Sequence, residues 1–181
     1  MTRPATIDNI WLGKTVAILG NGPAMTAALA DGARSRGWKT IAVNRAVQFA
    51  PDADMFVALD PHHPFWAAAE HFAGMKIAGV ETDEADGDPL LAGAHYAGMF
   101  YETVQIAPDH MIEIRNNFLA AMRIAMRAGA TRIVLMGIDA KAYDAAHGHT
   151  GFFGFAEGLA QLTAEAEAAG IRVDFVEAFG G

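Results

Sequence analysis

The amino-acid sequence predicts a single α/β domain, spanning residues 1–181, in which helices cover both faces of a mainly parallel sheet. A chain of 181 residues fits one domain and is long enough to bury a sizeable core. Hydrophobic residues make up 52% of the chain and charged residues 19%, a balance typical of a globular protein. Short apolar runs alternate with helical stretches, which favours parallel strands joined by right-handed crossovers. The expected architecture is therefore a three-layer, Rossmann-like sandwich.

The strands are predicted from short apolar runs that end at turn signals. "TVAIL" at 15–19 ends in glycines, and "TIAVN" at 40–44 follows Gly37. "MFVALD" at 55–60 follows the turn signal "APDAD". The acidic, glycine-rich stretch 81–98 has no clear period and is expected to be a loop. The predicted strands cover 15–19, 40–44, 55–60, 76–80, 99–106, 131–137 and 171–178.

The helices are predicted from apolar residues at helical spacing and from the residues at the helix ends. Met111, Ile114 and Phe118 recur at this spacing, and Gly129 ends the same stretch. Prolines in the first turn mark the starts of the first two helices. The predicted helices cover 23–36, 63–73, 109–128 and 152–169, and 138–151 is expected to be a loop.

The composition excludes several classes of protein and site. There are no cysteines, so disulfide frameworks and thiolate metal sites are excluded. No apolar run approaches the roughly 20 residues that span a bilayer. The absence of cysteines suits a cytoplasmic protein. The first 14 residues lack the apolar core of a signal peptide. A net charge of −8 disfavours a nucleic-acid partner. The apolar composition is compatible with a homo-oligomer.

The stretch "TVAILGNGPAM" raises the question of a phosphate ligand. Gly20 and Gly22 permit backbone angles that other residues resist, and they let the backbone approach a ligand. A helix that follows such a loop offers N–H groups and the positive end of its dipole to an anion. A phosphate bound at Asn21–Ala24, a range that includes Pro23, is therefore one interpretation. A tight strand–helix turn without a ligand is the other.

Two common cofactors fit this loop poorly. The dinucleotide fingerprint requires a third glycine, where this chain has Met25. It also requires an acidic residue after the second strand, where this chain has Asn44. Neither NAD nor FAD is therefore expected. The P-loop pattern is also absent, because no Gly-Lys-Ser/Thr follows.

Polar residues directly follow several predicted strands. In open α/β sheets, ligands bind at the carboxyl ends of the strands. The amides of Asn21 and Asn44 can donate to a phosphate or ribose oxygen, or accept from a base amine, and capping of turns is their alternative role. Arg45 follows Asn44 and can meet a phosphate, or it can remain solvated. Asp60 can bind Mg²⁺ together with phosphate oxygens, or cap the next helix. Asp139 can bind a ligand or brace its loop.

A histidine pair lies in the predicted loop near the end of the chain. His147 and His149 flank a glycine in "HGHTG". Imidazole titrates near neutral pH and can act as a general base at a sugar hydroxyl. The alternative is that both are exposed loop histidines without a catalytic role.

Three stretches together resemble one known layout: "VAILGNGPAM", "TIAVNRA" and "NNFLAAMRIAMRAGATRIVLMGIDA". It is similar to the layout of bacterial sialyltransferases that use CMP-sialic acid through a Rossmann-like domain. It is also similar to pterin-pyrophosphokinase-like domains, which occur in flagellin glycosylation, archaeal pterin synthesis and prophages. The resemblance covers residues 15–60 and 110–178.

The sialyltransferase resemblance implies roles for specific residues. Asn21 and Asn44 would contact the nucleotide. Asn116 and Asn117 stand where that family opens a helix with Thr-Ser-Gly, although a phenylalanine replaces the glycine here. Alanine also replaces the serine that usually follows Gly-Asn-Gly-Pro. His149 would be the general base, with His147 as the second choice.

The pyrophosphokinase-like resemblance implies a different chemistry. "PDADMFVALD" resembles the acidic segment of those domains, so Asp60 would bind magnesium and Asp139 would face it. The leading expectation is a nucleotide-binding transferase that transfers a glycosyl group from a nucleotide sugar. The alternatives are Mg²⁺-dependent diphosphoryl transfer and a non-catalytic, prophage-type nucleotide-binding protein.

Overall fold

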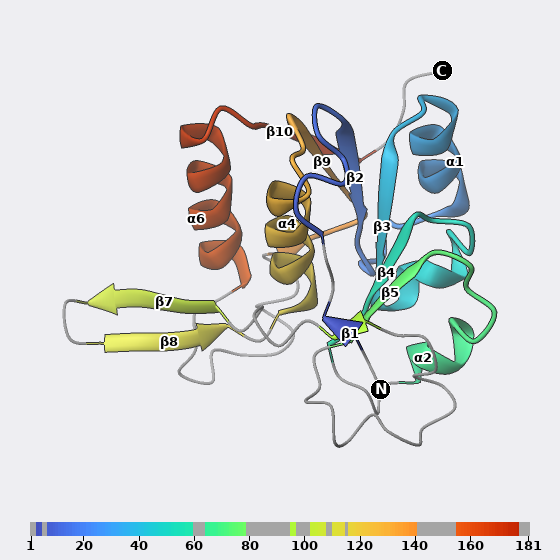
Figure 1. Cartoon of the computed structure of the whole chain (residues 1–181), viewed down its shortest axis with the longest axis horizontal. Helices are drawn as coiled ribbons and strands as arrows, with labels where there is room; N and C mark the ends of the chain where they lie inside the picture. The colour runs from blue at the N-terminus through green and yellow to red at the C-terminus, as the bar shows by residue number, and fades with distance from the viewer. Residues whose placement is uncertain are drawn as a thin grey trace.

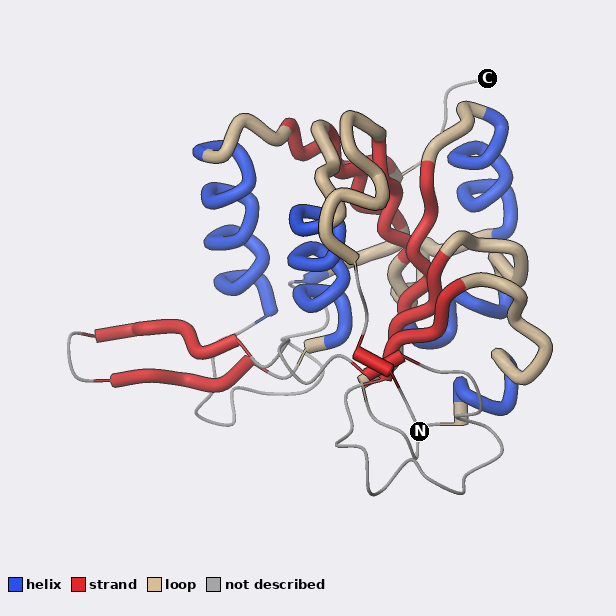
Figure 2. The backbone as a smooth tube through the Cα atoms, viewed as in Figure 1, coloured by secondary structure: helices blue, strands red, loops and turns tan. Residues whose placement is uncertain are grey.

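The computed structural model has an α/β, Rossmann-like fold built on an eight-stranded sheet (Figure 1). All strand pairs of this sheet are parallel, and Figure 2 shows the strands running between two layers of helices. The fold class predicted from the sequence is therefore confirmed. The structure describes residues 3–4, 7–59, 64–78, 95–96, 102–107, 110–114, 116–140 and 155–177.

The order of the strands reverses next to the centre of the sheet. From β2 the chain moves outward through β3 and β4 to β5, and it later returns to place β9 on the other side of β2. The point between β2 and β9 is therefore the topological switch point, where ligands bind in open α/β sheets. In spatial order the strands are β1 (Arg3–Pro4), β6 (His95–Tyr96), β5 (Met75–Ala78), β4 (Met55–Val57), β3 (Lys39–Val43), β2 (Thr15–Leu19), β9 (Arg132–Met136) and β10 (Arg172–Val176).

Helices cover both faces of the sheet because the central strands are apolar on both faces. Side chains alternate along β2: Val16 and Ile18 belong to one core, and Ala17 and Leu19 to the other. The first core lies under α4 (Asn117–Arg127) and α6 (Phe155–Ala168). The second lies under α1 (Ala27–Ser35), the short η1 (Asn44–Gln48) and α2 (Phe65–Ala68), on the opposite face in Figure 1.

The prediction of one helix over 109–128 is wrong in its first part. Residues His110–Ile114 form strand β8, which pairs antiparallel with β7 (Glu102–Ala107) in a separate two-stranded sheet. The helix begins only at Asn117, since the Asn116 side chain caps it. In "HMIEI", β-branched residues alternate with others, so the stretch suits a strand. Figure 1 shows this hairpin reaching out from the body near the starts of α4 and α6.

The first helix also begins later than expected. Pro23 lies in a turn, and Thr26 caps α1 by accepting a hydrogen bond from the Leu29 N–H at 3.3 Å. The predicted helix 63–73 is mostly not α-helical. Beyond α2, the N–H groups of Glu70 and Phe72 bond to carbonyls three residues back, so the chain continues in tighter turns.

Candidate functional site

The loops that follow β2 and β9 pack directly on one another at the switch point. The Gly20 N–H donates to the Met136 carbonyl at 2.8 Å, and the Gly22 N–H donates to the Gly137 carbonyl at 2.9 Å. A Cβ atom on Gly20 would overlap Cγ2 of Ile138. One on Gly22 would lie 2.8 Å from the Gly137 carbonyl oxygen. The close contact between the two loops therefore requires both glycines.

Unusual backbone angles are not the reason for these glycines. Gly20 and Gly22 do not have positive φ, whereas Gly137 across the contact has φ 63°. Met25 is buried there: a Cβ on Gly137 would lie 2.7 Å from the Met25 Cβ. The residue that replaces the third glycine of a dinucleotide fingerprint thus packs against the loop after β9.

The start of α1 offers hydrogen-bond donors next to this contact. Asn21, the second residue after β2, is exposed. The Thr26 hydroxyl satisfies the Leu29 N–H. Within the described part of the chain, the N–H groups at 27 and 28 have no hydrogen-bond acceptor. These N–H groups and the helix dipole together favour an anion at this end of α1.

Three elements meet through the side-chain amide of Asn117. The Asn117 Oδ1 accepts a hydrogen bond from the Leu59 N–H, two residues after β4, at 2.8 Å. The Asn117 Nδ2 donates to the Asn44 Oδ1, at the end of β3, at 2.9 Å. The sequence predicted both asparagines as ligand contacts, and the structure brings these two together at the carboxyl end of the sheet.

Asn44 has an uncommon backbone conformation. Its φ is 52°, in the left-handed region that asparagine tolerates better than most residues. It opens η1, whose Ala46 and Val47 are buried in the core. The backbone of Asn44 is therefore held from both sides, by β3 and by the packing of η1.

The neighbouring Asn116 has a different role. Its Oδ1 accepts hydrogen bonds from the Phe118 N–H at 2.8 Å and the Leu119 N–H at 3.1 Å, which caps α4. Phe118, in place of the glycine of the sialyltransferase pattern, is buried and packs edge-on against Phe155 with ring centroids 5.7 Å apart. Phe118 is thus part of the core.

The other predicted residues lie at the same end of the sheet or outside the described residues. Arg45 is exposed, and its guanidinium lies 5.4 Å from the centroid of the Phe49 ring. Asp139 is exposed, two residues after Gly137. Asp60, His147 and His149 lie outside the residues that the structure describes.

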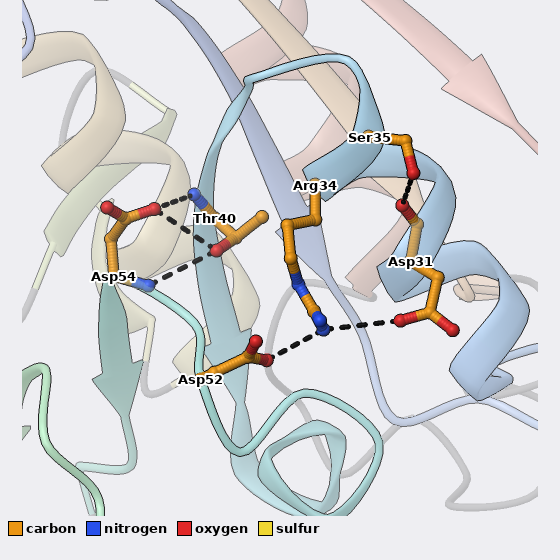
Figure 3. A network of polar contacts seen from close by, with 6 residues as sticks. All are labelled: Asp31, Arg34, Ser35, Thr40, Asp52 and Asp54. Carbon is orange, nitrogen blue, oxygen red and sulfur yellow. Dashed lines mark hydrogen bonds and ion pairs between the residues drawn. The ribbon is translucent and has the colours of Figure 1, made fainter.

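Ion pairs tie the strands together at the opposite, amino-terminal end of the sheet. The Asp54 carboxylate pairs with Lys39 at 2.6 Å. It also accepts a hydrogen bond from the Thr40 N–H at 2.9 Å (Figure 3). Arg34 of α1 bridges Asp31 and Asp52 in the same region. These contacts link α1 and the start of β3 to the segment that precedes β4.

A second cluster at this end joins β9 and β10. The Asp174 carboxylate contacts Arg132 at 2.6 Å and Arg172 at 2.8 Å. Burial raises the pKa of Asp174, but the hydrogen bonds and charges of the two arginines outweigh it and hold the pKa below its ordinary value. Arg132 also lies over the Trp38 ring, 5.3 Å from its centroid. The structural charges therefore gather at one end of the sheet, and the asparagines at the other.

Sequence reasoning missed the link from Asn117 to Leu59 and Asn44. The bonded residues are 58 and 73 positions apart, so no local pattern indicates the contact. The cap at Asn116 had a signal, because an asparagine precedes the apolar periodicity of α4.

Comparison with known proteins gives no family for this chain. No family model matches it, and no curated protein matches it. Among the described helices, none is long and apolar enough to cross a membrane. The same part of the chain holds no group of three or more His, Asp or Glu residues suited to a metal ion. The resemblances to sialyltransferases and pyrophosphokinase-like domains stay predictions.

Proposed function

We propose that this protein is a nucleotide-binding transferase that transfers a glycosyl group from a nucleotide sugar. The observation that carries the proposal is Asn44, held in a left-handed conformation and by Asn117 at the carboxyl end of β3. This end of the sheet is where ligands bind in open α/β folds. The sialyltransferase resemblance supports the reaction class.

In this proposal the nucleotide lies across the ends of β2 and β3. Its phosphate is bound by Asn21 and by the N–H groups at the start of α1, where the helix dipole stabilises negative charge. Its nucleoside contacts the amide of Asn44. Asn21 is exposed and Asn44 is half-buried, so a ligand can reach both side chains.

The transfer requires stabilisation of the leaving nucleotide and deprotonation of the acceptor hydroxyl. The acceptor hydroxyl oxygen forms a bond to the anomeric carbon, and the bond from that carbon to the phosphate oxygen breaks. The nucleotide leaves with the electron pair, and the start of α1 stabilises its charge. His149 takes the proton from the acceptor hydroxyl as general base.

A thermal-shift screen of mononucleotides and ATP, with and without Mg²⁺, tests the proposal. Ligand at 100 times its Kd stabilises the folded state by about 2.7 kcal/mol. For a domain of this size, that raises Tm by roughly 5 to 10 °C. We expect a monophosphate to stabilise the wild type without metal, and Asn21→Ala to lower the shift.

Two outcomes would overturn the proposal. Stabilisation by ATP only with Mg²⁺ would favour diphosphoryl transfer through Asp60 and Asp139. No shift with any nucleotide would favour a protein without nucleotide chemistry. If a monophosphate does bind, release of nucleotide from its sugar conjugate should fall in His149→Ala while binding stays unchanged.

A further inference from the structure

The hydrogen bonds around Asn117 fix the orientation of its amide. The Leu59 backbone N–H can only donate, so the atom of Asn117 that faces it at 2.8 Å is the acceptor Oδ1. The Asn117 NH₂ group then points the other way, toward Asn44. Because this NH₂ can only donate, it meets the Oδ1 of Asn44, at 2.9 Å.

The orientation of Asn44 follows from that of Asn117. Its Oδ1 is used by Asn117, and its NH₂ has no acceptor among the described residues. The side chain is half-buried at the carboxyl end of β3, and its backbone is fixed between β3 and η1. The NH₂ group is therefore presented as a donor whose partner must come from outside the described fold.

We propose that Asn117 is a positioning residue that makes Asn44 a donor, so that the site selects a nucleobase with a ring-nitrogen acceptor. This inference rests on the proposed nucleotide binding. Cytosine and adenine carry such an acceptor, at N3 and N1 respectively. Uracil and hypoxanthine carry an N–H donor at the same ring position, which would face the NH₂ of Asn44 without a hydrogen bond.

The substitution Asn117→Asp inverts this polarity. A carboxylate at 117 still accepts from the Leu59 N–H, and it lies at the start of α4, where negative charge is favourable. Its second oxygen can only accept, so the Asn44 amide must turn its NH₂ toward 117 and its oxygen toward the ligand. Asn116→Asp is the matched control, since it adds the same charge one residue away and keeps the cap.

The test measures Kd for two pairs of nucleotides that carry equal charge: CMP is compared with UMP, and AMP with IMP. An unpaired buried polar group weakens binding by about tenfold or more. We expect the wild type and Asn116→Asp to favour the base with the ring acceptor by about that factor, and Asn117→Asp to reverse the preference. If the wild type binds nucleotide but Asn117→Asp keeps the same base preference, the positioning role of Asn117 is refuted. The proposed nucleotide binding would not be affected by that result.

A second measurement tests the amide orientation without any ligand. Hydrogen exchange of the Asn44 side-chain NH₂, assigned by NMR with Asn44→Ala, should be fast in the wild type and slowed in Asn117→Asp. Equal exchange in the two proteins would refute the positioning role, whatever the nucleotide screen shows. No nucleotide binding by the wild type would instead refute the proposed function, on which the base selection depends.

Discussion

Replacing Gly20 with alanine places a methyl group between the two loops at the switch point. The new Cβ would overlap Cγ2 of Ile138, a side-chain atom that can move. It would also lie 2.8 Å from the Gly137 carbonyl oxygen and 3.2 Å from that of Met136, which belong to the backbone. The loops must therefore separate, and the hydrogen bond from Gly20 to Met136 is weakened.

The expected loss of stability follows from these contacts. Overpacking of this kind costs about 1 to 3 kcal/mol. Weakening the hydrogen bond adds about 1 kcal/mol, so the free energy of unfolding should fall by roughly 2 to 4 kcal/mol. With an m-value of about 2 kcal/mol per molar urea, the unfolding midpoint falls by about 1 to 2 M.

Urea unfolding followed by tryptophan fluorescence measures this change, since Trp11 and Trp66 are buried. Gly13→Ala is the matched control, because Gly13 has φ 74° and a Cβ added there would meet no described atom within 4 Å. It should cost only the backbone strain, about 1 to 2 kcal/mol. Ile138→Ala should rescue part of the loss in Gly20→Ala. A Gly20→Ala midpoint within about 0.3 M of the wild type would refute the packing explanation.

Four other substitutions test separate parts of the structure. Thr163 carries a buried hydroxyl without a partner among the described residues, so Thr163→Val should raise the free energy of unfolding by about 1 kcal/mol in urea titrations. Asp54→Ala leaves the Thr40 N–H without its acceptor and should lower that free energy by about 2 kcal/mol, whereas a neutral change would contradict the network in Figure 3. The pKa of Asp174 in the folded protein is below its unfolded value of 3.8. Ionised Asp174 therefore stabilises the folded state above pH 3.8, and this stabilisation is lost as the pH falls through the folded pKa. Asp174→Asn should therefore reduce the loss of Tm between neutral pH and pH 3, and an unchanged pH dependence would contradict it. Asn44→Asp keeps the oxygen that Asn117 bonds, so its Tm should match the wild type while nucleotide binding falls at least tenfold; unchanged Kd values would exclude Asn44 as a ligand contact.

The main sheet could be predicted from the sequence because its central strands are buried on both faces. Such strands appear as short continuous apolar runs, and 15–19 and 131–137 correspond to β2 and β9 within one or two residues. The hairpin β7–β8 could not be separated from α4 in the same way. Met111 and Ile114 continue the helical spacing of the residues after them, so the period alone does not locate the boundary. The capping asparagine was the local signal that marks it.

The candidate site was predictable by position but not by contact. Strand ends indicated Asn21 and Asn44, because a parallel sheet gathers its carboxyl ends at one edge. The bonds from Asn117 to Leu59 and Asn44 arise only when α4, β3 and β4 pack together. The same limit applies to the glycines, since the loop that Gly20 and Gly22 touch lies more than 100 residues further along the chain.

Because packing explains the glycines, Asn44 is the stronger indicator of a ligand site. Gly20 and Gly22 would be needed between these two loops with or without a ligand. Asn44 differs, because the fold uses only half of its side chain. The bond from Asn117 needs an acceptor oxygen, which aspartate would supply equally well, and aspartate tolerates the left-handed conformation too. Glycine would adopt that conformation with less strain. What neither replacement provides is the NH₂ group, and that group is the part of Asn44 that the described fold leaves without a partner. Ligand experiments therefore discriminate best when they change this donor and leave the glycine loop intact.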